Sequence, residues 1–286
     1  MKKILVTGAN GQLGQCLQKI SSQFEEFEFI FTDSETLDIT NKEEVNDFFW
    51  QNAPDFCINA AAYTAVDLAE TDIEKAFLVN ADGTENLAEA CAENNAQFIH
   101  VSTDYVFDGE NNLAYTEEDF TNPLGVYGAS KLAGDELALE VNPCSVILRT
   151  SWVYSEFGKN FVKTMLSLFA TKDELNIVAD QFGQPTNAND LAEAIMKIIK
   201  SEKITPGIFN FSNLGRISWF DFAEKIAGLS EAKIKLNAIE TSQYPTPAKR
   251  PKNSVLDLDK ISKTYAIQLK PWEESLEDCI QILQNN

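Results

Sequence analysis

The feature that most constrains this chain is an alternation of short apolar segments with amphipathic ones. Helical patterns such as KEEVNDFFWQN and TENLAEACAEN separate apolar, β-branched runs, which are KKILVTG, FEFIFTD, DFCINAAA, QFIHVST and SVILRTS. Strands that alternate with helices build βαβ units around a parallel sheet. We therefore expect an α/β fold with a doubly wound parallel sheet over residues 1–150.

The second half of the chain follows a looser pattern. After residue 150, helical stretches such as NFVKTMLSLFA mix with short strand-like runs and the proline-broken segment TSQYPTPAKRP. We expect residues 151–286 to form mainly a smaller substrate-binding lobe. No linker or repeat separates the halves, so the two lobes are expected to pack closely together. Strands near 205–213 are expected to return to the main sheet.

The first strand runs directly into a glycine pattern. Gly8, Gly11 and Gly14 lie between that strand and a helix, where glycine lets main-chain N–H groups approach a pyrophosphate at the positive helix end. Asp33 follows at the end of the next strand, about 20 residues further on, where such folds place an acid for the adenosine ribose. The pattern predicts a Rossmann-like dinucleotide site, and a glycine turn that serves only packing is the alternative.

Asp38 and Ile39, which follow Asp33 in the chain, are candidates for the adenine pocket. Asp38 and Ile39 in LDIT lie where the chain approaches the next strand. Asp38 is equally suited to cap the helix that begins at NKEEV. The residues alone leave both interpretations open.

Composition excludes several classes of protein. The net charge of −21 would repel nucleic acid and anionic membranes. The N-terminus has no apolar signal segment and no run is long enough to span a bilayer, so we expect a cytoplasmic protein. The five scattered cysteines suggest neither disulfides nor a metal site, and the single histidine, His100, is expected in a strand, not as a ligand or base.

Tyr127 and Lys131 in VYGASK are the candidate catalytic pair. Residues four apart share one face of a helix, and a nearby ammonium lowers the pKa of a phenol. The pair can therefore act as a proton-transfer device, although a helix offers this spacing by chance as well.

The glycine spacing and the Tyr-x-x-x-Lys pair together resemble the extended short-chain dehydrogenase/reductase family. In that family a serine or threonine ends the fourth strand, and QFIHVST supplies Thr103 in this place. The resemblance implies that Thr103 orients the substrate oxygen and that Tyr127 passes the proton. It implies that Lys131 holds the nicotinamide ribose and lowers the pKa of Tyr127.

Longer strings resemble one branch of that family, the dTDP-4-dehydrorhamnose reductases. They cover nearly the whole chain and include NAAAYTAVDLAE, VSTDYVFDG, LRTSWVY, KNFVKTM, DQFGQPT and RPKNSVLDL. Related dehydratases carry Thr-Asp-Glu where this chain has Thr103-Asp104-Tyr105, so the glutamate base for water elimination is missing. The resemblance implies reduction of dTDP-4-dehydro-β-L-rhamnose to dTDP-β-L-rhamnose with NADPH or NADH.

The same resemblance assigns site residues by position. Gly11, Gln12 and Leu13 are expected at the cofactor phosphates, and Ala62, Tyr63 and Thr64 at the ribose and nicotinamide. Many relatives have histidine where this chain has Tyr63. The residues expected to contact the dTDP-sugar are Thr103, Asp104, Tyr105, Trp152 and Arg250.

Two of these assignments have plain alternatives. Trp152 would otherwise be an ordinary core aromatic after a strand. Lys249 and Arg250 form the most concentrated positive charge available for a diphosphate, but they would also suit a solvated loop.

Other functions stay open at this stage. The chain could act on another nucleotide sugar as a reductase or epimerase, or it could be a non-catalytic subunit similar to the regulatory subunit of methionine adenosyltransferase. The intact Thr103, Tyr127 and Lys131 argue against the second. A homodimer is a further expectation.

Overall fold

Six parallel strands form the central sheet of the computed structural model, which describes residues 1–285. They lie in the order β10-β5-β4-β3-β1-β2, and each neighbouring pair is parallel. The order reverses between β1 and β3, where a doubly wound sheet opens its binding crevice. The strands are β1 (Lys2–Thr7), β2 (Phe27–Phe31), β3 (Phe56–Asn59), β4 (Gln97–Thr103), β5 (Val146–Thr150) and β10 (Gly207–Asn210).

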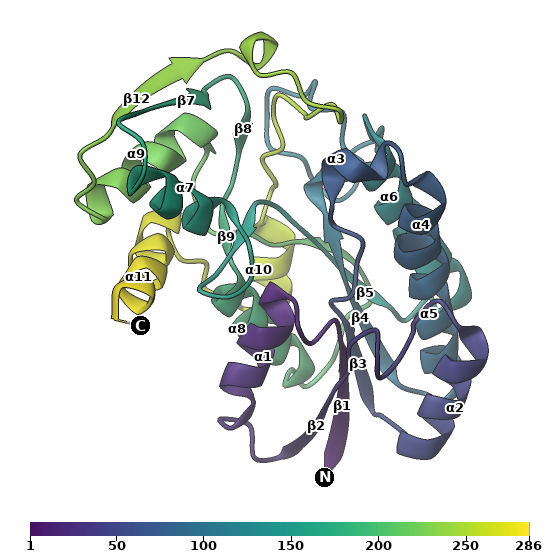
Figure 1. The fold of residues 1–286 in the computed structure, drawn as a ribbon. Coiled ribbons are helices and arrows are strands. Elements are labelled where there is room, and N and C mark those ends of the chain that lie inside the picture. The colour runs from purple at the N-terminus through teal and green to yellow at the C-terminus, as the bar shows by residue number, and fades with distance from the viewer. Residues whose placement is uncertain (286) are drawn as a thin grey trace.

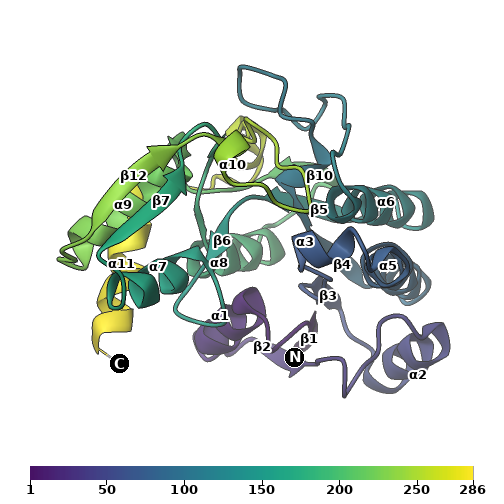
Figure 2. The same cartoon turned by 45° about the horizontal axis from the view of Figure 1, so that its top comes forward.

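Helices cover both faces of this sheet (Figures 1 and 2). Successive strand residues point to opposite faces, so in β1 Ile4 and Val6 pack towards α1 and α8, whereas Leu5 packs towards α2, α5 and α6. None of the helices within residues 1–285 is long and apolar enough to cross a bilayer. The covering helices are α1 (Gln12–Ser21), α8 (Ala188–Ile199), α2 (Lys42–Asn52), α5 (Gly83–Glu93) and α6 (Val126–Val141).

The N-terminus of α2 is capped by Asn41 and not by Asp38, because the Asn41 side chain accepts a hydrogen bond from the main-chain N–H of Glu44.

Short helical turns lie between β3 and α5 and directly after β4. The short elements are α3 (Val66–Ala69), α4 (Ile73–Phe77), a π-helical turn (Leu78–Asp82) and a 3₁₀ turn (Asp104–Val106).

The second lobe has its own core beside the sheet (Figure 2). Its helices pack on a parallel pair, β7 with β12, around Phe222, Ile226 and Leu276. Two smaller pairs, β6 with β9 and β8 with β11, form separate two-stranded sheets. The elements are β6 (Val153–Tyr154), α7 (Phe161–Phe169), β7 (Glu174–Val178), β8 (Phe182–Gly183), β9 (Thr186–Asn187), β11 (Ile217–Ser218), α9 (Trp219–Leu229), β12 (Lys235–Ile239), a 3₁₀ turn (Thr241–Gln243) and α11 (Trp272–Asn285).

Part of the second half belongs physically to the first. Strand β10 pairs with β5, and α8 and α10 (Asp259–Tyr265) complete the apolar layer below the sheet. Without α8, part of that face of the sheet would be exposed to water. We therefore propose residues 1–150 together with α8, β10 and α10 as the dinucleotide-binding domain, and the rest as the substrate lobe.

Candidate active site

A cleft of about 1090 Å³ lies at the carboxyl edge of the sheet. Its walls come from the glycine loop, from the ends of β3, β4 and β5, and from the start of α7 and α9 in the second lobe. Most of the residues expected at the cofactor and the substrate line it. They are Gly8, Gly11, Gln12, Leu13, Asp33, Asp38, Ile39, Ala62, Thr64, Thr103, Asp104, Tyr105, Tyr127, Lys131 and Trp152.

The glycine loop is shaped so that its backbone can approach a ligand. Gly8 has φ +69°, and a Cβ there would lie 2.6 Å from the carbonyl carbon of Ala60. Gly14 does not line the cleft. A Cβ at Gly14 would lie 2.4 Å from the Gly8 carbonyl oxygen, so close packing against the loop requires glycine at this position. Gly11 precedes α1 without a side-chain cap. The first-turn N–H groups of α1 are therefore free of side-chain caps beside the cleft and fit the pyrophosphate of a dinucleotide.

The side chains of Gln12 and Leu13 are engaged by the protein itself. The Gln12 amide donates to the Val153 carbonyl at 3.2 Å, and its oxygen accepts from Asn160 at 2.8 Å. Leu13 is buried in the core below the sheet. Gln12 thus ties the glycine loop to the second lobe.

The two acidic residues expected near the adenosine part of the cofactor, Asp33 and Asp38, accept hydrogen bonds from nearby side chains. The Asp33 carboxylate accepts from the Asn10 amide at 2.6 Å and from the Thr36 hydroxyl at 3.0 Å. These bonds, chiefly that from Thr36, lower the pKa of Asp33. Asp38 accepts from the Thr40 hydroxyl at 2.8 Å. A fixed anion at the Asp33 position suits ribose hydroxyls and not a 2′-phosphate.

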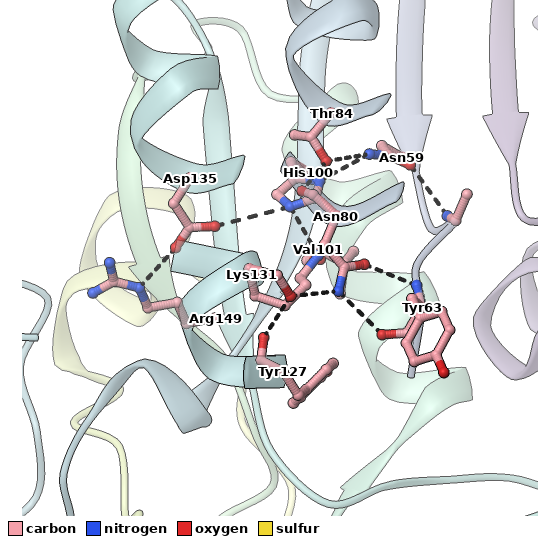
Figure 3. A network of polar contacts seen from close by, with 12 residues as sticks. Asn59, Tyr63, Asn80, Thr84, His100, Val101, Tyr127, Lys131, Asp135 and Arg149 are labelled. Carbon is pink, nitrogen blue, oxygen red and sulfur yellow. Dashed lines mark hydrogen bonds and ion pairs between the residues drawn. The ribbon is translucent and has the colours of Figure 1, made fainter. Parts of the chain in front are cut away.

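The loop of residues 61–64 is anchored by a residue that the sequence did not single out. Asn80 in the π-helical turn accepts from the Tyr63 N–H at 2.8 Å and donates to the Tyr63 carbonyl at 3.1 Å and to the Ser130 hydroxyl at 2.9 Å (Figure 3). The Tyr63 phenol donates to Asp72 at 3.1 Å. The Tyr63 side chain therefore does not line the cleft, whereas Ala62 and Thr64 do.

Helix α6 carries Tyr127 and Lys131 one turn apart. Its cap Gly125 has no side chain, and the Glu70 carboxylate instead accepts from the Val126 N–H at 2.9 Å. A Cβ at Gly128 would lie 2.2 Å from the Tyr105 carbonyl oxygen, so this glycine lets the helix approach the turn after β4. The first turn of α6 is therefore held close to Thr103 at the end of β4.

Thr103 and Tyr127 both line the cleft. Thr103 is buried, and its hydroxyl donates to the Asp104 carboxylate at 3.0 Å. Loss of hydration raises the pKa of Tyr127 to about 12, and the Thr103 contact acts in the opposite direction. At neutral pH the phenol therefore keeps its proton and can donate it.

The Lys131 side chain is held by strand β4. Its Nζ lies 2.9 Å from His100 Nε2 and donates to the Val101 carbonyl at 2.8 Å (Figure 3). Burial lowers the pKa of Lys131 to about 8. The Lys131 amine is engaged by β4, and among the groups near Tyr127 it is Thr103 that lowers the pKa of the phenol.

The acid beside Thr103 is buried as well. Asp104 is 2 % exposed, and burial raises its pKa to about 7. Tyr105 packs edge-on against Tyr127 with ring centroids 5.7 Å apart, and burial also raises the pKa of Tyr105. Tyr105 stands where the related dehydratases carry glutamate, so the site lacks that second acid for elimination.

The outer wall of the cleft is aromatic. Trp152, at φ +46°, stacks on Trp219 with ring centroids 3.5 Å apart. Trp219 and Phe161 also line the cleft, together with Lys159. These three residues were missed from the sequence, because nothing in their local pattern distinguishes a cleft wall from a lobe core.

Arg250 lies outside the cleft lining. Its guanidinium donates to both oxygens of Asp67 at 3.0 and 2.8 Å, and so joins the proline-rich segment to α3. No group of three or more His, Cys, Asp or Glu side chains within residues 1–285 is arranged to hold a metal ion.

The doubly wound sheet, the glycine loop and the Thr103, Tyr127 and Lys131 set in one cleft define an extended short-chain dehydrogenase/reductase. Residues 1–285 match the family model described as RmlD substrate binding domain. A dTDP-4-dehydrorhamnose reductase from Aggregatibacter actinomycetemcomitans is 45% identical over 97% of this chain and 98% of its own length. The chain belongs to the dTDP-4-dehydrorhamnose reductase family.

Solved structures agree with this placement. A dTDP-4-dehydrorhamnose reductase from Clostridium acetobutylicum has 43% identity and a TM-score of 0.94, with 99% of both chains covered. One from Bacillus anthracis, in complex with NADP, has 38% identity and a TM-score of 0.95 over 99% of this chain and all of its own. The fold, including the second lobe, is therefore that of the family.

Proposed function

We propose that this protein reduces dTDP-4-dehydro-β-L-rhamnose to dTDP-β-L-rhamnose with NADPH or NADH, as the last step of dTDP-L-rhamnose synthesis. The observation that carries the proposal is that Thr103, Tyr127 and Lys131 line one cleft together with the glycine loop. The relative from Bacillus anthracis that binds NADP supports the choice of cofactor.

The residues of this chain account for the proton side of the reaction. When bound, the reduced nicotinamide would supply the hydride to the carbonyl carbon. Tyr127 donates its phenolic proton to the carbonyl oxygen as negative charge develops there, and Thr103 orients that oxygen. With the pKa of Tyr127 raised to about 12, the proton stays on the phenol until the more basic alkoxide forms.

Binding is assigned to groups of the cleft. The first turn of α1 fits the pyrophosphate of the dinucleotide, and Asp33 fits its adenosine ribose. Trp152 and Asp104 are assigned to the sugar nucleotide, because both line the cleft on the side of Tyr127. Lys131 is assigned to the nicotinamide ribose.

We also propose a homodimer in the cytoplasm. Leu68, Ile73 and Leu78 are exposed by 56%, 49% and 43% along α3, α4 and the turn that follows. Such exposed apolar side chains suit contact with a second copy. Light scattering on the purified chain would separate a dimer from a monomer, and fractionation of cells would test the location.

The reaction itself is tested by turnover. Purified protein, the dTDP-4-keto sugar and NADH or NADPH should give loss of absorbance at the nicotinamide wavelength and formation of dTDP-rhamnose. Turnover with UDP- or GDP-linked keto sugars only would favour another nucleotide sugar as substrate. Binding of NADH without turnover of any keto sugar would favour a non-catalytic subunit.

A further inference from the structure

His100 is completely buried and lies directly behind the catalytic lysine. It lies in β4, and its ring is between Lys131 on one side and Asn59 of β3 on the other (Figure 3). Nε2 is 2.9 Å from Lys131 Nζ, and Nδ1 is 3.0 Å from the Asn59 amide nitrogen. The proposed reduction assigns this ring no part, so its contacts require another explanation.

The orientation of the Asn59 amide is set by its neighbours. Its oxygen accepts from the Ala61 main-chain N–H at 3.1 Å and from the Thr7 hydroxyl at 2.8 Å. A main-chain N–H can only donate, so the oxygen must face Ala61 and the NH₂ group must face His100. Asn59 therefore donates to Nδ1 of the histidine.

The tautomer of His100 follows from this contact. A ring nitrogen that accepts a hydrogen bond carries no proton, so a neutral imidazole has its proton on Nε2. Burial holds the pKa of His100 well below its usual range, which keeps the ring neutral. Nε2–H thus points towards Lys131 Nζ at 2.9 Å.

Two donors cannot share that contact. A charged lysine has three N–H donors and no acceptor, whereas a neutral amine has one lone pair that can accept from Nε2–H. The amine can still donate to the Val101 carbonyl at 2.8 Å. The contact is satisfied only when Lys131 is neutral.

Other titratable groups face this pair, and the charge of Asp135 opposes the effect of burial on the pKa of Lys131. Asp135 on α6 has one oxygen 3.8 Å from His100 Nε2 and its other oxygen 3.2 Å from Arg149 Nε on β5. A carboxylate on that side favours the proton on Nε2. Tyr127 is neutral in the same range of pH, because burial raises its pKa.

We propose that His100 is a positioning residue that holds Lys131 as a neutral amine in the cofactor-free protein, through an Nε2–H donor that Asn59 orients. The effect adds to burial, which lowers the pKa of Lys131 to about 8 against the opposing charge of Asp135. One consequence rests on the proposed function: a lysine that binds the ribose as an ammonium must leave His100 and take up a proton from solvent when the dinucleotide binds.

The tautomer can be measured without any substitution, because His100 is the only histidine of the chain. Ring ¹⁵N shifts of the cofactor-free, untagged full chain should show a protonated Nε2 and an unprotonated Nδ1 at neutral pH. A protonated Nδ1 would allow Nε2 to accept from a charged lysine, and that result would overturn the proposal.

The effect on Lys131 is separated from burial by His100→Gln. The glutamine oxygen can face Nζ as an acceptor, so the NMR titration midpoint of Lys131 should rise by at least about one pH unit, a tenfold change in its protonation equilibrium. The Lys131 signal is assigned by its loss in Lys131→Met, and circular dichroism of His100→Gln checks the fold. An unchanged midpoint in a folded His100→Gln variant would show that burial alone sets it and would reject the proposal.

Cofactor binding gives a readout that distinguishes this inference from the proposed function. Calorimetry of NADPH or NADH binding near pH 8, in two buffers of different ionisation enthalpy, should show uptake of up to one proton in the parent and less in His100→Gln. Binding with equal uptake in both proteins would contradict the role of His100. A parent that binds neither NADPH nor NADH would instead refute the proposed function, and the histidine tautomer would still decide the inference.

Discussion

The Arg250 guanidinium binds both carboxylate oxygens of Asp67, 183 residues away in the chain, at 3.0 and 2.8 Å. The pair joins the proline-rich segment of the second lobe to α3 beside the cleft. Burial is partial, with 22% of the Arg250 side chain and 42% of Asp67 exposed, so the net contribution of the pair to stability is about 1 kcal/mol or less. A ligand phosphate can therefore compete with Asp67 for the guanidinium.

This pair sharpens the assignment of Arg250 to the substrate, which stays a prediction. Arg250→Ala should raise KM for the dTDP-sugar and leave NADH affinity unchanged. Asp67→Asn weakens the competing contact, so KM for the sugar should stay the same or fall. Steady-state kinetics of both variants would decide: an equal rise of KM in the two would mean that the pair only braces the loop.

A second prediction concerns cofactor choice. Hydrogen bonds from Asn10 and Thr36 hold the Asp33 carboxylate in place. The basic side chains that line the cleft are Lys131 and Lys159, and neither lies in the turn that follows β2. NADH should therefore be used at least as well as NADPH, and Asp33→Ser should shift the ratio of kcat/KM towards NADPH. Competing assays with both cofactors measure this ratio. A parent with exclusive preference for NADPH would refute the role given to Asp33.

Asp104 gives a prediction about stability and pH. Burial raises its folded pKa to about 7 from 3.8, so the folded protein holds this proton more tightly than the unfolded chain does. The cost of ionising Asp104 is absent near pH 4, grows as pH rises, and is complete above about 7. Asp104→Asn should therefore stabilise the cofactor-free protein at pH 8 by up to a few kcal/mol, and show no such gain at pH 4.

Asp108 is the matched control, because its pKa is shifted in the opposite direction. The hydrogen bond from the Glu110 N–H and that from the Tyr115 phenol lower the pKa of Asp108. Asp108→Asn should destabilise the protein at neutral pH, and the loss should shrink as pH falls below the ordinary aspartate range. Urea unfolding at several pH values tests both variants. The same sign of effect at pH 8 for the two would contradict the environments described here.

The central fold and part of the site could be predicted from local sequence. The alternation of apolar and amphipathic runs can be read from short stretches of sequence, and it predicts the parallel sheet. The glycine loop is likewise predicted from the positions of Gly8, Gly11 and Asp33. Tyr127 and Lys131 were placed on one helix face by spacing alone, and α6 carries both. These features are local, so one sequence suffices to see them.

Long-range contacts could not be predicted in the same way. The stacking of Trp152 on Trp219, the Arg250–Asp67 pair and the Lys131–His100 contact each depend on how two distant elements pack. His100 was correctly expected in a strand, but its ring faces the catalytic helix only because β4 packs beneath α6. Helical spacing predicts which residues share a face, not which strand side chain meets them.

The roles of Tyr127 and Lys131 separate in one pair of variants. Lys131→Met keeps the apolar stem but removes the amine, so both NADH binding and turnover should fall. Tyr127→Phe keeps the ring and the helix, so NADH binding should survive while turnover falls. Fluorescence titration with NADH compares them, and equal loss of binding in both would contradict the separation.

The most direct test of the whole account is kcat of Tyr127→Phe with the dTDP-4-keto sugar and saturating NADH. The phenolic proton is the only one assigned to the developing alkoxide, so kcat should fall by roughly 10²–10⁴-fold, the range for loss of a general acid. Near-parental kcat in Tyr127→Phe would show that the proton comes from another group, and would contradict the catalytic assignment.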